Sequence, residues 1–148
     1  METTQCNGKD RHGGGTGNPV NDISGAMATD REDSGAKAKA TGQAKWAFLV
    51  YMAGDNNLDG AALRDIAEMA RAGSTKDVHI LVQLDRLDDQ KTRRFRITRG
   101  GGFKKDCIET FSESNTGDPQ VLYSFCKWAI DNYPADRYAL ILWNHGSG

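Results

Sequence analysis

The stretch Trp46-Ala-Phe-Leu-Val-Tyr-Met52 decides the fold class of this 148-residue chain. It is an unbroken apolar run, which is typical of a β-strand that is covered on both faces. Polar turn residues follow, and from Leu58 apolar residues recur at helical spacing until Gly73, which ends the predicted helix. A second apolar run over residues 78–84 predicts another strand. Strand, helix and strand at this spacing predict a parallel βαβ unit.

The rest of the chain continues the alternation of strands and helices. Residues 92–98 alternate charged and apolar side chains, which predicts a half-exposed strand. Three glycines at 100–102 then predict a hairpin at the sheet edge, because no helical pattern follows that would make them a phosphate-binding loop. Asp118 caps the next predicted helix and Pro119 takes its first position. Residues 137–143 form a last apolar strand, so the fold class is α/β.

The first 45 residues differ in composition from the remainder. They hold 8 of the 17 glycines, no leucine and no aromatic residue, whereas all aromatic residues lie at or after Trp46. Such a segment cannot bury enough apolar surface to offset the entropy of ordering it. We therefore predict a disordered tail over residues 1–45 and a folded part over residues 46–148, which is 148 minus 45, or 103 residues.

Charge and composition exclude several functions. Nineteen Lys and Arg against 20 Asp and Glu give a net charge of −1, which favours neither nucleic acid nor a membrane surface. The chain has no apolar run long enough to span a membrane and no secretory signal, so its localisation stays open. Cys6, Cys107 and Cys126 lack metal-binding spacing, as do the three scattered histidines, so we expect no metal site and only structural or incidental cysteines.

Two polar loops are expected to meet at one place in the sheet. In a doubly wound sheet the second strand lies on one side of the first strand and the third parallel strand on the other, and ligands bind between the diverging loops. These loops are residues 54–57, where Asn56 or Asn57 can cap the following helix, and residues 144–148. The second loop contains His145, whose imidazole suits general acid–base work. A plain turn with a capped helix would explain the same residues.

The last predicted strand lacks a neighbour. It is apolar along its whole length and runs directly into the loop at residue 144, close to Gly148. One edge of residues 138–143 would therefore be bare, which folded proteins avoid. We interpret this as a sheet that has been cut.

Three segments resemble the clostripain family of cysteine peptidases. They are Trp46…Tyr51-Met-Ala-Gly-Asp-Asn-Asn-Leu58, Thr116-Gly-Asp-Pro119 and Asn132-Tyr-Pro-Ala-Asp-Arg-Tyr-Ala-Leu-Ile-Leu-Trp-Asn-His-Gly-Ser-Gly148. The resemblance covers nearly all of residues 46–148 and none of the tail. It implies a caspase-like (gingipain-like) partial sheet of mainly parallel strands flanked by helices. It also implies hydrolysis of peptide bonds after Arg or Lys.

The resemblance also implies roles for individual residues. His145 matches the catalytic histidine, and Gly146 would offer its backbone N–H to the oxyanion. Asp55, Asn56 and Asn144 match positions that we expect to support the site. Calcium is a possible cofactor by family resemblance only, and members of the family are often secreted or at the cell surface in bacteria.

One part of the family pattern is missing. In caspase-like enzymes the nucleophilic cysteine follows the histidine by about 50 residues, whereas Cys107 and Cys126 both precede His145. We therefore expect a light-chain-like N-terminal fragment that is inactive alone, whether a processed light chain or a truncated reading frame. Its expected partners are a peptide or protein substrate with a basic residue and a downstream cysteine-bearing segment or heavy chain.

Two other functions fit the same residues. The chain could be a non-catalytic pseudo-enzyme or interaction module, or a flavodoxin-like binder of a small ligand at the same pair of loops. The bare edge of the last strand favours the peptidase fragment, because a self-sufficient module should not end on an exposed apolar strand.

Overall fold

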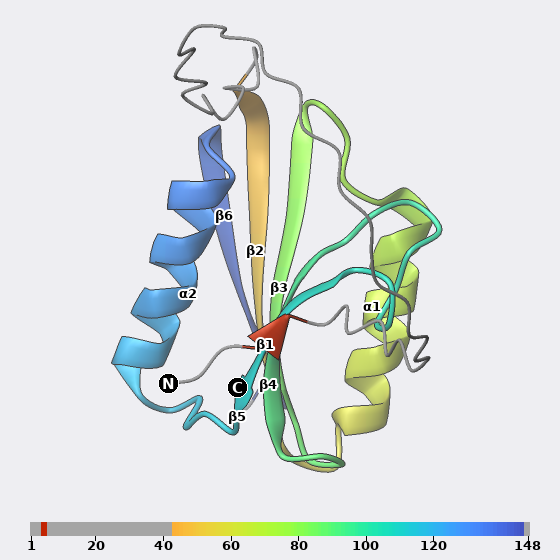
Figure 1. Cartoon of the computed structure of the whole chain (residues 1–148), viewed down its shortest axis with the longest axis vertical. Helices are drawn as coiled ribbons and strands as arrows, with labels where there is room; N and C mark the ends of the chain where they lie inside the picture. The colour runs from red at the N-terminus through yellow and green to blue at the C-terminus, as the bar shows by residue number, and fades with distance from the viewer. Residues whose placement is uncertain (1–3, 6–42, 147–148) are drawn as a thin grey trace, which may run out of the picture.

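The computed structural model describes residues 4–5 and 43–146, and all structural statements below concern these residues. They form one sheet with the strand order β1-β5-β4-β3-β2-β6 and two helices that flank it (Figure 1). This confirms the predicted α/β class. The elements are β1 (Thr4–Gln5), β2 (Ala44–Gly54), α1 (Asp59–Ala72), β3 (Val78–Arg86), β4 (Lys91–Arg96), β5 (Cys107–Ser112), α2 (Pro119–Asn132) and β6 (Ala135–Trp143).

Strand β2 lies at the centre of the parallel part of the sheet. It pairs in parallel with β3 on one side and with β6 on the other, so that Trp46 lies opposite both Val78 and Arg137. The predicted strand order is therefore confirmed. A strand in this position has neighbours along both edges, which is why its sequence is an almost continuous apolar run.

The side chains of β2 alternate between two apolar cores. Val50 and Met52 pack in the core under α1, together with Ile66 of that helix. Leu49 and Tyr51 point to the opposite face and join the core under α2. Each helix thus covers one face of the sheet, which gives a three-layer arrangement (Figure 1).

Strand β4 is less exposed than its alternating sequence predicts. It lies between β3 and β5, with Thr92 and Phe95 fully buried and Arg94 only 8% exposed. The prediction of a half-exposed strand at the edge was wrong because the charge of Arg94 has partners inside the fold. Its guanidinium donates to Gln83 (2.9 Å) and Glu109 (3.3 Å).

The outer end of the sheet is also more complete than predicted. Strand β5 pairs with β4 and, on its other side, with the short strand β1, so the β4–β5 hairpin does not form the edge. The glycines at 100–102 lie in the β4–β5 connection. There the Asp106 carboxylate accepts hydrogen bonds from the backbone N–H groups of Thr98 (3.0 Å) and Gly102 (2.8 Å).

Strand β2 begins before the predicted tail boundary. Ala44 is buried and pairs with Ala135, so the predicted boundary at residue 45 falls inside β2. Thr4–Gln5 add the two residues of β1. The rest of the predicted tail, including Cys6, lies outside the described residues.

The two helices begin differently. Asp118 caps α2 as predicted, because its side chain accepts a hydrogen bond from the Gln120 N–H at 2.8 Å. The N-cap position of α1 is Leu58, which makes no side-chain cap hydrogen bond. The prediction that Asn56 or Asn57 occupies the cap position was therefore wrong. Asn56 instead forms a turn just before it.

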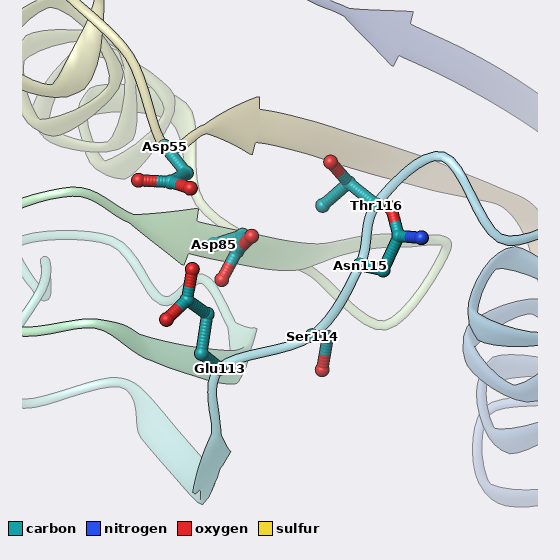
Figure 2. Close-up of a pocket in the computed structure, with 6 residues that line it drawn as sticks. All are labelled: Asp55, Asp85, Glu113, Ser114, Asn115 and Thr116. Atoms are coloured by element: carbon teal, nitrogen blue, oxygen red, sulfur yellow. The ribbon is translucent and has the colours of Figure 1, made fainter.

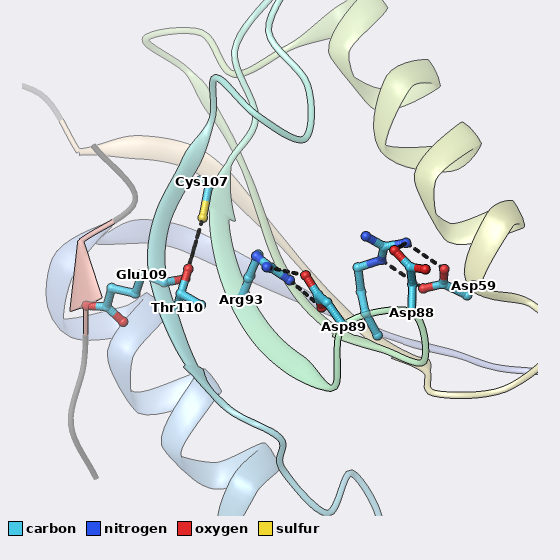
Figure 3. Close-up of polar contacts among 8 residues, drawn as sticks. Asp59, Asp88, Asp89, Arg93, Cys107, Glu109 and Thr110 are labelled. Atoms are coloured by element: carbon cyan, nitrogen blue, oxygen red, sulfur yellow. Dashed lines mark hydrogen bonds and ion pairs between the residues drawn. The ribbon is translucent and has the colours of Figure 1, made fainter. Parts of the chain in front are cut away.

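An ion pair fixes the start of α1 to the end of β3. Arg86 donates from Nε to one Asp59 oxygen at 2.9 Å and from Nη2 to the other at 2.6 Å. Both side chains are largely buried, and Arg93 makes a similar pair with Asp89 nearby (Figure 3). Because this pair is bidentate and shielded, it restrains the loop between β2 and α1.

Strand β6 forms the other edge of the sheet. Leu140 is 47% exposed, Ile141 43% and Leu142 67%, so side chains on both faces of this strand contact solvent. Among the described residues no strand pairs with its outer edge. The expected bare, apolar edge is therefore present.

Candidate active site

The carboxyl ends of β2 and β6 lie side by side. Met52 pairs with Trp143, so the loop after β2 and the loop after β6 start next to each other. These are the two loops that the sequence predicts to converge. Since β3 lies on the other side of β2, the chain reverses its winding direction here, which is where open α/β sheets bind ligands.

The His145 side chain reaches from one loop to the other. Its Nε2 lies 2.7 Å from Oδ1 of Asn57, and its backbone N–H donates to Oδ1 of Asn144 at 2.7 Å. The side chain of His145 is exposed. Within the described residues the ring is held through Nε2 alone, which leaves Nδ1 for a reacting group.

Asn56 joins the same two loops through its side chain. Its Nδ2 donates to the Ala53 carbonyl at 2.8 Å and to Oδ1 of Asn144 at 3.4 Å. Its Oδ1 accepts from the Leu58 N–H at 2.8 Å. Asn56 therefore shapes the β2 loop and holds the β6 loop against it.

The end of β6 is anchored on its other face as well. The indole N–H of Trp143 donates to the Asp65 carboxylate of α1 at 2.8 Å.

Gly146 follows the histidine with φ of +61°, a left-handed conformation that favours glycine. A Cβ at this position would meet open space, so backbone conformation rather than clearance calls for glycine here.

Asp55 is not part of this network. Its side chain lines a neighbouring pocket of about 450 Å³, together with Asp85 of β3 and the loop after β5 (Figure 2). The remaining lining residues are Glu113, Ser114, Asn115 and Thr116. Tyr51 anchors the loop after β5, because its hydroxyl donates a hydrogen bond to the Thr116 carbonyl at 3.2 Å.

Three carboxyl groups shape the electrostatics of this pocket. Burial raises the pKa of Asp85 above its usual range, an effect that the Thr92 hydroxyl opposes and the nearby Asp55 charge increases. Desolvation also raises the pKa of Glu113, with smaller contributions from Asp55 and Asp85. Burial, and then the charge of Asp85, raise the pKa of Tyr51 to about 12. An additional negative charge in this pocket is therefore energetically unfavourable.

Asp85→Asn is expected to change how stability depends on pH. A folded-state pKa above the unfolded one means that Asp85 contributes stability below its unfolded pKa, near its ordinary value of 3.8, and loses that contribution as pH rises through the folded pKa. The amide can still accept from the Thr92 hydroxyl. Urea unfolding at pH 4 to 8 should show the variant gaining stability relative to wild type as pH rises. A variant that loses ground as pH rises would contradict this.

The described cysteines are not activated nucleophiles. Cys107 is disulfide-bonded. Cys126 is a free thiol on α2, partly buried against the core, and burial raises its pKa. A catalytic thiolate needs the opposite shift. Cys107 lies on β5 and Cys126 on α2, so neither belongs to the loops that carry Asn57 and His145.

Two features are absent from the described residues. Over residues 4–5 and 43–146, no three or more His, Cys, Asp or Glu side chains are arranged to hold a metal ion. Neither helix in these ranges is long and apolar enough to cross a membrane.

The structure also adds residues that the sequence reasoning missed. The sequence predicts Asn57 as a member of the loop at the site and as a candidate helix cap, but not its contact with His145, which depends on a pairing 88 positions apart. Asp85 carried a usable signal, since it is the one acid in β3 and lies next to the end of that strand. Glu113 and Thr116 lie in a loop whose position is set only by the tertiary fold.

Comparison with known proteins gives consistent matches. A sequence model of the clostripain family matches residues 50–148. Clostripain of Hathewaya histolytica is 29% identical over 152 residues, which covers 88% of this chain and 29% of clostripain. The chain thus spans under a third of the length of that relative.

Solved structures of cysteine proteases also match this chain. A cysteine protease of B. fragilis is 28% identical with a TM-score of 0.57, and the match covers 70% of this chain and 91% of that one. A secreted C11 cysteine protease of Bacteroides thetaiotaomicron, solved with an irreversible peptide inhibitor, is also 28% identical with a TM-score of 0.57. That match covers 70% of this chain and 30% of the other. The chain therefore belongs to the clostripain family of cysteine peptidases.

Proposed function

We propose that this chain is the light-chain-like, N-terminal part of a clostripain-type cysteine endopeptidase that cleaves after Arg or Lys. The observation that carries the proposal is the position of His145. Its imidazole stands at the end of a parallel strand, exposed, and is held at Nε2 by Asn57 of the neighbouring strand's loop. An exposed, oriented imidazole is what a cysteine nucleophile requires as its base.

In the proposed reaction, His145 works on a thiol supplied by the remainder of the protein. Nδ1 takes the thiol proton, and the thiolate attacks the carbonyl carbon of the scissile bond. The backbone N–H of Gly146 donates to the oxyanion that forms. The imidazolium then protonates the leaving amine, and a water molecule, deprotonated by the same ring, hydrolyses the thioester.

The exposed edge of β6 supports the claim that the remainder docks here. Its outer side has unpaired backbone groups among the described residues, and Leu140, Ile141 and Leu142 are exposed. Such an edge is a template for another strand. A strand paired there would bring its own loop beside His145, which is where the proposed thiol is needed.

The test compares the chain alone with the chain produced together with the segment that follows it in the gene. Fluorogenic peptide amides ending in Arg or Lys are the substrates, and amides ending in Glu or Leu are the controls. We expect no hydrolysis by the chain alone and hydrolysis of the Arg and Lys amides by the pair. Hydrolysis by the chain alone, or no activity of a stably associated pair, would overturn the proposal.

A further inference from the structure

We propose that Asn57 is a positioning residue that fixes the orientation and the proton distribution of the His145 ring. The inference rests on the proposed peptidase function for its catalytic consequence. Its structural basis is the 2.7 Å contact between Asn57 Oδ1 and His145 Nε2.

The chemistry of this contact determines where the ring proton lies. An amide oxygen can only accept a hydrogen bond, so Nε2 must carry the hydrogen when it faces Oδ1 of Asn57. The neutral ring then has its lone pair on Nδ1. That nitrogen is the only basic atom of the ring, and it is the one that Asn57 leaves open. A ring with the opposite tautomer would present an N–H to the thiol and could not act as its base.

The same contact helps after proton transfer. When Nδ1 takes a proton, the ring becomes positively charged and its Nε2–H becomes a stronger donor. A hydrogen bond from a charged donor is stronger than one between neutral groups. Asn57 thus stabilises the imidazolium that must form beside the thiolate, in the manner of the third member of a catalytic triad.

Asn57 has no evident structural task that would explain it otherwise. It is exposed, it does not cap α1, and its only side-chain hydrogen bond among the described residues is the one to His145. Its neighbours hold it in place. Asn56 fixes the backbone before Leu58, and the ion pair between Asp59 and Arg86 fixes the start of α1.

The first experiment requires no peptidase activity. Nitrogen-15 spectra of the neutral His145 ring are recorded for the wild-type chain and for Asn57→Asp, Asn57→Ala and Asn57→Leu. Aspartate keeps an acceptor oxygen, whereas leucine has a similar size and none. We expect only the Nε2–H tautomer in wild type and Asn57→Asp, and a mixture of both tautomers in Asn57→Ala and Asn57→Leu. The same tautomer ratio in all four proteins would overturn the proposal.

The second experiment measures kinetics in the assembled peptidase. Asn57→Ala is expected to lower kcat about 10²-fold with KM changed less than about twofold, because the ring loses its orientation while substrate binding is kept. Melting temperatures of the variant and wild-type chains should agree within about 4 °C, since the site is exposed. An unchanged kcat, or a loss confined to KM, would overturn the proposal. Inactivity of every assembly would instead contradict the proposed function and leave the tautomer result to decide the role of Asn57.

Discussion

His145→Ala is expected to lower kcat/KM of the assembled peptidase by about 10²- to 10⁴-fold, which is the usual contribution of a general acid–base group. The ring has two tasks in the proposed reaction, since it deprotonates the thiol and then protonates the leaving amine. Steady-state hydrolysis of an Arg amide measures the loss. Because His145 is exposed at a strand end, the folded state should not be destabilised.

His79→Ala is the matched control for this loss. His79 also carries an imidazole on a parallel strand, but its ring packs against Tyr133 with centroids 5.5 Å apart. We expect the activity per folded molecule to be unchanged in this variant. The effects of the Asn57 and His145 substitutions on activity should be coupled. Adding Asn57→Ala to His145→Ala should lower the activity almost no further. Full activity of His145→Ala would refute its catalytic role.

Gly73→Ala is expected to destabilise the fold by at least about 3 kcal/mol. Gly73 ends α1 with φ of 66° and ψ of 167°, a region that only glycine occupies readily. A Cβ built there would lie 2.1 Å from the backbone nitrogen of Arg99 and 2.6 Å from its Cα. These are backbone atoms that cannot rotate away, so the connection after β4 would have to move. The free energy of unfolding in urea measures the effect.

Gly100→Ala is the control that separates strain from steric conflict. Gly100 has a similar φ of 68°, but a Cβ there would have no atom within 4 Å. We therefore expect a cost of only about 1 to 2 kcal/mol, which is the penalty of a left-handed conformation for alanine. Equal destabilisation by the two substitutions would show that the contact with Arg99 does not matter.

Local sequence patterns predicted most of the fold. The apolar run of β2, the capped start of α2 at Asp118 and the helical spacing of α1 each predicted an element of the observed type. These features are local because strand burial and helix capping depend on neighbouring residues. The strand order around β2 also followed, since parallel strands joined by helices have few possible arrangements.

The prediction for β4 failed for a reason that local patterns cannot contain. Alternating arginines normally indicate a face in water, yet Arg94 is buried. Its guanidinium lies over the rings of Phe111 and Trp128, at 4.9 and 5.1 Å from their centroids, and reaches Gln83 and Glu109. These partners lie on other strands and on α2. A residue's burial is decided by such partners as well as by its own polarity.

The features of the site also separate into those that the sequence predicts and those that depend on tertiary contacts. The order of residues by itself determined that a histidine follows an apolar strand, that a glycine follows the histidine, and that an Asp-Asn-Asn loop follows the first strand. It also determined the resemblance to the clostripain family. Only the tertiary structure decided that Asn57 rather than Asp55 contacts His145, and that Asp55 turns instead to the pocket with Asp85. Adjacent residues of a tight turn point in different directions, and which of them meets a loop 88 positions away depends on how β2 and β6 pair.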